Sequence, residues 1–357
     1  MRFPTILATS AVLVAAHPGV DHTNEILQRR EFLSNIKRSD LSHCSAKLKA
    51  RGVEDRAIKR RQAIAAAKSK RGIVQRDLSD KNKSHLSTEA YTLDTPLDTI
   101  FAANTSCLLS PEVTEGPYYV GGEYIRQDVT EEQSGVPLTV DIAVYDVETC
   151  EPVSSAWVEI WHCNATGVYS GVPSGSDYSS APENVNTTFL RGFQQTDADG
   201  AISFDTIYPG HYSGRTNHIH VDVHPDATPR ANNTILDDTA SHVGQIYFDQ
   251  SLTDAVETFS PYSTNTQPIT TNDGDSLLDE SLATGDAIVE YVLLGETVDE
   301  GLLAWISFGI NTTYTRTVSL AATLYETGGV ASSGGSGGGP GGAGGGPGGA
   351  GGHPPSK

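Results

Sequence analysis

Apolar and polar residues alternate along many short stretches of this chain, beginning near residue 100. In 138–147, Leu138, Val140, Ile142 and Val144 share one side, which is the period of a β-strand. Six further stretches with strand-forming composition are 156–163, 197–207, 217–224, 244–249, 287–295 and 302–310. Gly, Pro, Asp and Asn separate them, as expected of turns. The pattern predicts a mainly β fold, and specifically a β-sandwich domain over residues 100–325.

Residues 24–75 have a different composition, rich in Ala, Leu, Lys, Arg, Glu and Gln with almost no Gly or Pro. This composition favours helix. The stretch also carries four dibasic pairs, at 29–30, 37–38, 60–61 and 70–71. Residues 17–99 are therefore predicted to be either a helical pro-segment that a kexin-type protease removes, or a helical arm that is retained for dimerisation, followed by a linker. Both interpretations remain open, and so does a homodimer.

The two ends of the chain differ in composition from the predicted β domain: the first resembles a targeting signal and the last has low complexity. Residues 1–16 combine a basic residue, a short apolar run and terminal small residues, which predicts a secretory signal peptide. That run is too short to cross a bilayer, and no later stretch is long enough. Residues 326–357 are dominated by glycine without a strict period of three, which predicts a disordered tail.

Charge is divided unevenly along the chain. Residues 1–90 contain 18 of the 24 Lys and Arg but only 9 of the 44 Asp and Glu, so a basic segment precedes a strongly acidic one. An acidic domain repels nucleic acid and anionic membranes, which excludes both as expected partners.

Secretion is also supported by cysteines and sequons. The cysteines are Cys44, Cys107, Cys150 and Cys163, with three possible pairings if all form disulfides. The N-x-S/T sequons begin at Asn82, Asn104, Asn164, Asn186, Asn232 and Asn311. We therefore expect an extracellular glycoprotein.

One segment, "YSGRTNHIHVDVH" (212–224), concentrates candidate chemistry. On a strand, His218 and His220 point to the same face, with Cα atoms roughly 7 Å apart, so both rings can reach one metal ion. The pattern alone equally fits an exposed polar face, because H-x-H is a short motif.

Four separated motifs favour a metal site over an exposed polar face. They are "EGPYY" (115–119), "WVEIWHCNATGVYSG" (157–171), "FLRGFQQTDADGAISFDTIYPGHYSGRTNHIHV" (189–221) and "GQIYFD" (244–249). In this order they resemble the intradiol ring-cleaving dioxygenases, especially the secreted fungal members, and they cover most of 107–250. The resemblance implies a β-sandwich, in agreement with the strand pattern.

The resemblance also implies a site. Tyr169, Tyr212, His218 and His220 fall where the family has its iron ligands, so one non-haem Fe(III) per chain is expected. Two phenolates and two imidazoles suit Fe(III) better than Fe(II). The implied substrates are a catechol and dioxygen, and the implied product is a cis,cis-muconate. Tyr212 is expected to leave the iron and act as the base, while Tyr169 stays bound.

Further residues receive roles by the same resemblance or by their position. Arg215 is expected to stabilise negative charge on the ring, or else to form a structural ion pair, and Gln245 is expected near substrate and iron. Gly116, Pro117 and Tyr118 are predicted either to shape the pocket or to form the entry to a strand without contacting the substrate. Trp157 and Trp161 are predicted to be core residues rather than a platform for the substrate. None of the other histidines is predicted to be a ligand: His162 and His224 are expected next to the ligands or at the surface, and His211 is expected to line the pocket or to be exposed.

Two other classes of protein remain as alternatives. One is a secreted β-sandwich binding module with a vestigial or structural metal site. The other is a cupin-like H-x-H metalloprotein, which is disfavoured because no glutamate follows His220 closely.

Overall fold

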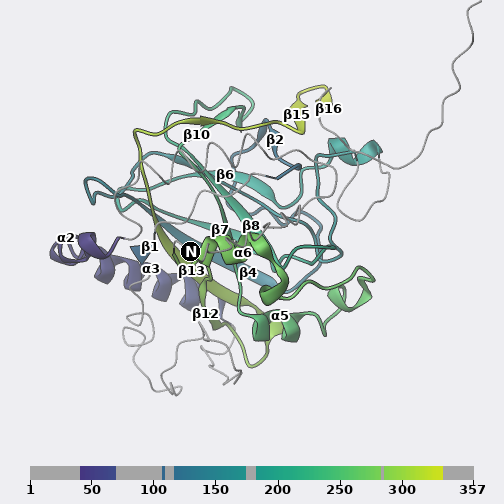
Figure 1. Ribbon diagram of the computed structural model, residues 1–357, viewed down its shortest axis with the longest axis horizontal. Helices are drawn as coiled ribbons and strands as arrows, with labels where there is room; N and C mark the ends of the chain where they lie inside the picture. The colour runs from purple at the N-terminus through teal and green to yellow at the C-terminus, as the bar shows by residue number, and fades with distance from the viewer. Residues whose placement is uncertain (1–40, 70–106, 109–115, 174–181, 283–284, 333–357) are drawn as a thin grey trace, which may run out of the picture.

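The computed structural model describes residues 41–69, 107–108, 116–173, 182–282 and 285–332 (Figure 1). The described part is mainly β, as predicted. The predicted signal peptide, three of the dibasic pairs, the sequons at Asn82 and Asn104, and residues 333–357 lie outside the described residues.

The first sheet has the order β1-β13-β4-β7, with β12 added beside β13. β13 pairs in parallel with both β1 and β4, while β7 and β12 are antiparallel to their neighbours. Its strands are β1 (Cys107–Leu108), β4 (Pro137–Asp146), β7 (Ala201–Ile207), β12 (Glu290–Leu293) and β13 (Leu302–Ile310).

The second sheet has the order β11-β8-β5-β6, and all of its pairings are antiparallel. Strand β6 was missed by the sequence analysis. The members of this sheet are β5 (Trp157–Trp161), β6 (Arg191–Gln195), β8 (His218–His224) and β11 (His242–Tyr247).

Short strands and helices surround these sheets. The strands are β2 (Val120–Gly121), β3 (Glu123–Tyr124), β9 (Thr234–Ile235), β10 (Thr239–Ala240), β14 (Arg316–Thr317), β15 (Ala322–Tyr325) and β16 (Gly328–Ala331). The α-helices are α2 (Ser45–Ala50), α3 (Val53–Lys68), α5 (Gln250–Val256) and α6 (Ser276–Leu282). The 3₁₀ turns are η1 (Ser42–Cys44), η2 (Pro182–Asn186), η3 (Tyr262–Thr264), η4 (Asn272–Gly274) and η5 (Val298–Glu300).

Strand β16 corrects one predicted boundary. It pairs with β15, so ordered structure continues through residues 328–331, which the composition had assigned to the glycine-rich tail. Backbone pairing with a neighbouring strand is available to glycine as to other residues, so composition alone placed the boundary too early.

One hydrophobic cluster lies between the two sheets. The first sheet contributes the side of β4 with Val140 and Ile142, and the second contributes Ile219, Val221 and Val223 of β8. The β4 residues belong to the set that the alternation placed on one side of that strand. Each large aliphatic side chain buried in this way contributes about 1.5–3 kcal/mol relative to its exposed state.

The basic segment packs against the outer side of the first sheet, where Figure 1 shows α2 and α3 in purple. Leu41 and Leu48 contact Ala143 and Tyr145 of β4. From α3, Ala65 joins a cluster with Trp305 of β13 and other residues of β12 and β13. The outward side of β4 is therefore buried as well, which explains why that strand is buried on both faces.

A disulfide between Cys44 and Cys150 joins this segment to the turn after β4. Cys163 is a free, buried cysteine. The sequence had left the pairing open.

Ion pairs complement the apolar contacts of the helical segment. Arg60 and Arg61, one of the dibasic pairs, both bind the buried carboxylate of Asp141, at 2.7 and 3.1 Å. The remaining pairs join basic residues of the segment to acidic residues of the β domain: Arg51 with Glu151, Arg56 with Asp199, and Lys68 with Asp205. The basic and acidic parts of the sequence thus meet in the folded chain.

Among the described residues, no helix has the length and apolar character needed to cross a membrane.

Candidate metal centre

Strand β8 is buried along its whole length, on both faces. Ile219, Val221 and Val223 face the core, so the alternation places His218 and His220 on the opposite face. An apolar cluster covers that face; it includes Tyr119 and Val120, Ala240 and Val243, and Val318 and Ala322. The interpretation of this face as an exposed polar surface is therefore wrong, because segments distant in sequence cover it.

Two turns bring the tyrosines to this face. Tyr169 lies in the turn after β5, where Asn164 Oδ1 accepts hydrogen bonds from the backbone N–H groups of Thr166 and Val168. Tyr212 lies in the turn before β8. The turns pack closely because Gly210 approaches the backbone of Asn164, and a Cβ there would lie 2.3 Å from its carbonyl oxygen. Glycine is thus required at 210 for the two tyrosines to meet.

Nε2 of His218 lies close to the donor atoms of the other three predicted ligands. Tyr169 Oη lies 3.4 Å from this atom, Tyr212 Oη lies 3.5 Å away, and Nε2 of His220 lies 3.2 Å away. All four side chains are at most 3% exposed. The structure therefore brings together the four residues that the sequence analysis had nominated.

Neighbouring groups orient the two histidine rings. Nδ1 of His218 lies 2.7 Å from the carbonyl oxygen of Thr216, which can only accept, so Nδ1 carries the proton and Nε2 presents its lone pair to the centre. A metal-binding histidine commonly has this arrangement. Trp161 stacks on the His220 ring, with 3.5 Å between centroids and 8° between planes.

Burial controls the protonation of the two phenols. Desolvation raises the pKa of Tyr169 well above its ordinary value, and the nearby Tyr212 raises it further. Desolvation likewise raises the pKa of Tyr212, although the positive charge of Arg215 opposes this effect. Both residues are therefore neutral phenols unless a cation compensates the loss of their protons.

Arg215 and Gln245 form a buried network beside the centre. Nη2 of Arg215 donates to Oε1 of Gln245 and, at 3.3 Å, contacts the hydroxyl of Tyr247. That hydroxyl in turn donates to Oε1 of Gln245 at 2.8 Å. Gln245 pairs with His220 in the β-ladder, which places this network next to the predicted ligands.

Asp275 completes the network and was missed by the sequence analysis. Its Oδ2 accepts hydrogen bonds from Nε of Arg215 at 2.9 Å and from the backbone N–H of Thr216 at 2.8 Å. Burial depresses the pKa of Arg215, but the negative charge of Asp275, together with the tyrosines Tyr212 and Tyr247, outweighs this effect and the net shift is upward. The stretch "GDSLL" indicates a helix start, but nothing in it reveals a partner 60 positions earlier.

The other nominated residues have mixed outcomes. Tyr118 stacks on Tyr169 with centroids 4.8 Å apart, and Gly116 precedes it with a φ of +78°. Trp157 packs against Phe193 and Ile235, as a core residue would. Trp161 is buried as predicted but also contacts a predicted ligand.

The three remaining histidines are all buried, so a surface position is excluded for each. His162 binds the Cys163 carbonyl and the Thr206 hydroxyl. His211 binds Glu257 and the Gln267 carbonyl, at 2.8 and 3.0 Å. Nδ1 of His224 lies 2.6 Å from the Thr239 carbonyl oxygen.

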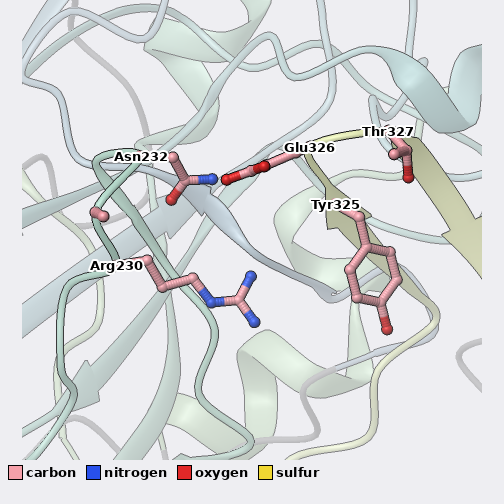
Figure 2. Close-up of a pocket in the computed structure, with 6 residues that line it drawn as sticks. Arg230, Asn232, Tyr325, Glu326 and Thr327 are labelled. Carbon is pink, nitrogen blue, oxygen red and sulfur yellow. The ribbon is translucent and has the colours of Figure 1, made fainter.

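A surface pocket lies elsewhere on the molecule (Figure 2). Its lining residues come from the loop before β9, from the end of β15 and from the turn between β15 and β16, and none of them belongs to the predicted centre. They are Arg230, Ala231, Asn232, Tyr325, Glu326 and Thr327.

Comparisons with known proteins bear on the identity of this centre. Residues 114–249, which include all four predicted ligands, match the family model described as "Dioxygenase". The chain is 31% identical to an intradiol ring-cleavage dioxygenase from Tetranychus urticae over 58% of this chain and 96% of that one, with a TM-score of 0.48. The chain belongs to the intradiol ring-cleavage dioxygenase family.

Curated members of this family match over a shorter range. Catechol 1,2-dioxygenase 1 of Acinetobacter lwoffii is 33% identical over 108 residues, which is 29% of this chain and 32% of that protein. Catechol 1,2-dioxygenase of Acinetobacter baylyi is 31% identical over 128 residues, covering 34% and 38%. The chain thus spans about a third of the length of these intradiol dioxygenases.

Proposed function

We propose that this protein is a secreted, non-haem Fe(III) intradiol dioxygenase that opens the ring of a catechol between its hydroxyl-bearing carbons. The observation that carries this proposal is the convergence of Tyr169, Tyr212 and His220 on His218 within 3.5 Å, in a fully buried position. Family membership and the two sheets around a shared core support the same assignment and its β-sandwich architecture.

The donor set fits a trivalent iron ion. Two phenolate oxygens and two neutral imidazole nitrogens form a hard, anionic set, which favours Fe(III). Burial holds both phenols in their neutral form, and a trivalent cation supplies the positive charge that permits their deprotonation. Without a metal, this buried group of polar side chains would be costly to desolvate.

A bound ferric ion would supply the Lewis acidity that withdraws electron density from the ring of a catechol and makes the ring reactive toward dioxygen. Tyr169, Tyr212, His218 and His220 would hold it. The overall reaction adds both atoms of dioxygen to one catechol and yields one cis,cis-muconate-type dicarboxylic acid, so no external reductant is needed.

Tyr212 is the residue proposed to accept a proton from the substrate, at its phenol oxygen. Burial raises the pKa of Tyr212, so a phenolate at this position would be a strong base. Tyr169 is proposed to remain a ligand. Its ring is held between Tyr118, stacked at 4.8 Å, and Trp161, edge-on at 5.6 Å.

Arg215 is proposed to stabilise negative charge that develops on the substrate. Its guanidinium is fully buried, and the upward pKa shift keeps it charged. Nε and Nη2 are engaged by Asp275, Gln245 and Tyr247, whereas Nη1 has no hydrogen-bond partner in the described structure. That N–H group is the donor that we assign to the substrate.

Secretion and glycosylation are part of the proposal. The Cys44–Cys150 disulfide supports an oxidising compartment, where such bonds form and persist. Among the described sequons, Asn186 and Asn232 are exposed, and Asn164 and Asn311 are partly buried. The first two are therefore the expected glycosylation sites.

Iron content, visible absorption and activity test the proposal together. The purified secreted protein should contain iron, show the red-brown colour of tyrosinate-to-iron charge transfer, and convert catechol, hydroxyquinol or protocatechuate to a ring-opened dicarboxylate under dioxygen. A colourless, iron-loaded protein would refute the tyrosine ligands. A coloured protein that opens none of these or related catechols would favour the binding-module alternative.

A further inference from the structure

The outer face of the second sheet carries a second group of possible metal ligands beyond the predicted iron centre. Asp222 and His224 follow His220 on the same face of β8, and Glu159 of β5 lies opposite Asp222 in the ladder. All three side chains are 0% exposed. One donor atom from each lies within 4.8 Å of the others.

The orientation of His224 points into this group. Its Nδ1 lies 2.6 Å from the carbonyl oxygen of Thr239, so Nδ1 carries the proton in that hydrogen bond. In the neutral ring, Nε2 therefore presents a lone pair. It has no hydrogen-bond partner and lies 3.7 Å from a carboxylate oxygen of Glu159.

A lone pair facing a carboxylate is unfavourable in a buried site unless a proton or a metal cation lies between them. Neither carboxylate oxygen of Glu159 has a hydrogen-bond partner. The Tyr119 phenol is within hydrogen-bonding reach of the Glu159 carboxylate, although in this structure its hydroxyl donates to the backbone carbonyl of Asp237 at 3.3 Å.

The surrounding charges fit a divalent cation. Arg191 is a buried cation near this group. Among the acidic residues, Glu123 has the largest electrostatic effect on Arg191. The guanidinium donates to Ser170 and Tyr118 rather than to the carboxylates of the group. Burial raises the pKa of Glu159 to about 8, and a bound divalent ion would supply the positive charge that keeps Glu159 and Asp222 deprotonated.

We propose that Glu159, Asp222 and His224 hold a divalent transition-metal ion of the zinc or manganese type, at a site distinct from the iron centre. Carboxylate oxygens with one imidazole nitrogen suit these ions. The hydrogen bond from His224 to the Thr239 carbonyl is the outer contact that orients a ligating histidine. The ion would join β5 to β8 where two carboxylates otherwise face each other.

This site does not depend on the proposed ring cleavage, although it adjoins the iron centre. Nε1 of Trp161 donates to Oδ2 of Asp222 at 3.4 Å, and the same indole stacks on the His220 ring. Trp161 thus contacts one residue of each site, so the second ion is expected to influence the position of His220 without contacting the substrate.

The test uses the full-length, iron-loaded protein incubated with Zn²⁺ alone and then freed of loosely held metal. Elemental analysis is expected to find zinc in addition to iron. Anomalous scattering at the zinc edge should place the zinc between Glu159, Asp222 and His224. Glu159→Gln and His224→Gln should each lose the zinc while keeping iron and the visible colour.

A matched control is His162→Gln. His162 is equally buried, but both of its ring nitrogens are hydrogen-bonded, to Cys163 and Thr206. This variant should keep both metals. In addition, His218→Ala should lose iron and keep zinc, which separates the failure of one site from the failure of the other.

Three outcomes would overturn the proposal. The first is the absence of zinc from the wild-type protein, and the second is its persistence in both Glu159→Gln and His224→Gln. Alternatively, an infrared band of a protonated carboxyl group that disappears in Glu159→Gln would show that a proton occupies the position. Burial raises the pKa of Glu159 to about 8, which makes this the competing arrangement. If the variants fail to fold, the anomalous map of the wild-type protein tests the proposal, because it shows whether zinc lies between the three proposed ligands.

Discussion

The carboxylate of Asp275 lies 2.9 Å from Nε of Arg215, and both side chains are buried. The same carboxylate accepts hydrogen bonds from the backbone of Thr216 and, at its other oxygen, from the backbone N–H groups of Leu277 and Leu278. Asp275 therefore fixes the proposed charge-stabilising arginine and the start of α6 at the same time.

Replacement of Asp275 tests this positioning role. Asp275→Asn keeps the shape but removes the charge that holds Arg215, so we expect kcat to fall about 10- to 100-fold through misplacement of the guanidinium. Iron content and the visible spectrum should remain, because Asp275 is not a predicted ligand. Asp273→Asn is the control, since Asp273 is exposed two residues away. Loss of iron, or unchanged kcat, would contradict the assignment.

Substitution of the four predicted ligands distinguishes the residues that give rise to the visible absorption from the residues that are needed to bind iron. Tyr169→Phe and Tyr212→Phe should each change the visible charge-transfer band, because each removes one tyrosinate. His218→Ala and His220→Ala should lose iron, as measured by elemental analysis. Unchanged iron content in both histidine variants would exclude them as ligands.

Tyr208→Phe provides a matched control for the tyrosine variants. Tyr208 is also fully buried, and its hydroxyl is hydrogen-bonded to Thr253 at 2.6 Å, away from the centre. The colour should therefore persist in this variant. A similar loss of colour would indicate a general effect of removing a buried hydroxyl.

Much of this centre was predictable because two signals agree locally. The alternation in β8 fixes the faces of His218 and Ile219, and the tyrosine-bearing motifs resemble those of one family. The burial of the polar face was not predictable, because the residues that cover it come from segments near 119, 240 and 318. Long-range contacts of this kind leave no periodic trace in the covered strand.

The helical segment shows the same limit. Composition predicted helix within 24–75, and helices occupy 45–50 and 53–68. Its role could not be read from the dibasic pair at 60–61, since that pattern is shared by protease sites and by ion-paired helices. The decisive contact is with Asp141, some 80 positions away, and Asp141 has only the ordinary polar position of an alternating strand.

Replacement of Asp141 should destabilise the fold strongly. Asp141→Asn leaves Arg60 and Arg61 without their common anion, and Arg61 is almost fully buried. Breaking a buried ion pair by removing one partner typically costs about 3–5 kcal/mol. Denaturant unfolding should show a loss of this order.

Asp199→Asn is the corresponding control at an ion pair that is more exposed. Its partner Arg56 is largely exposed, and the two groups lie 2.8 Å apart. An exposed pair is worth about 0–1 kcal/mol, so this variant should be nearly as stable as the wild type. Equal effects of the two substitutions would contradict the anchoring role of Asp141.

The mature protein is expected to retain residues 41–69. Arg60 and Arg61 lie within helix α3 and bind Asp141, so they are not presented as an extended dibasic substrate. Treatment of the folded protein with a kexin-type protease should leave this pair uncut, as judged by mass spectrometry after reduction. Rapid cleavage between these residues in the wild-type protein would favour the pro-segment interpretation.

The disulfide provides an independent measure of the same attachment. It links positions 106 apart, and a loop of this size corresponds to about 4–5 kcal/mol of chain entropy in the unfolded state. The double variant Cys44→Ala, Cys150→Ala should lose stability of this order, while Cys163→Ala should not alter the attachment of the segment. A double variant as stable as the wild type would show that the helical contacts alone suffice.

Acid stability should depend on Asp146, which joins the turn after β4 to the end of β13. Its Oδ1 accepts from Thr149, and its Oδ2 accepts from the backbone and hydroxyl of Thr312. Partial burial pushes the pKa of Asp146 upward, but the hydrogen bonds from Thr312 and Thr149 outweigh it, and the net shift is downward.

A depressed pKa in the folded state stabilises the fold at pH values above the unfolded pKa, about 3.9 for aspartate. This contribution is lost as pH falls through the folded pKa, because protonation then occurs in both states. Asp146→Asn should therefore be less stable than the wild type at pH 6, and the difference should shrink in acid. Urea unfolding from pH 6 to pH 2 measures both curves, and a constant difference across this range would exclude Asp146 as a source of the acid sensitivity.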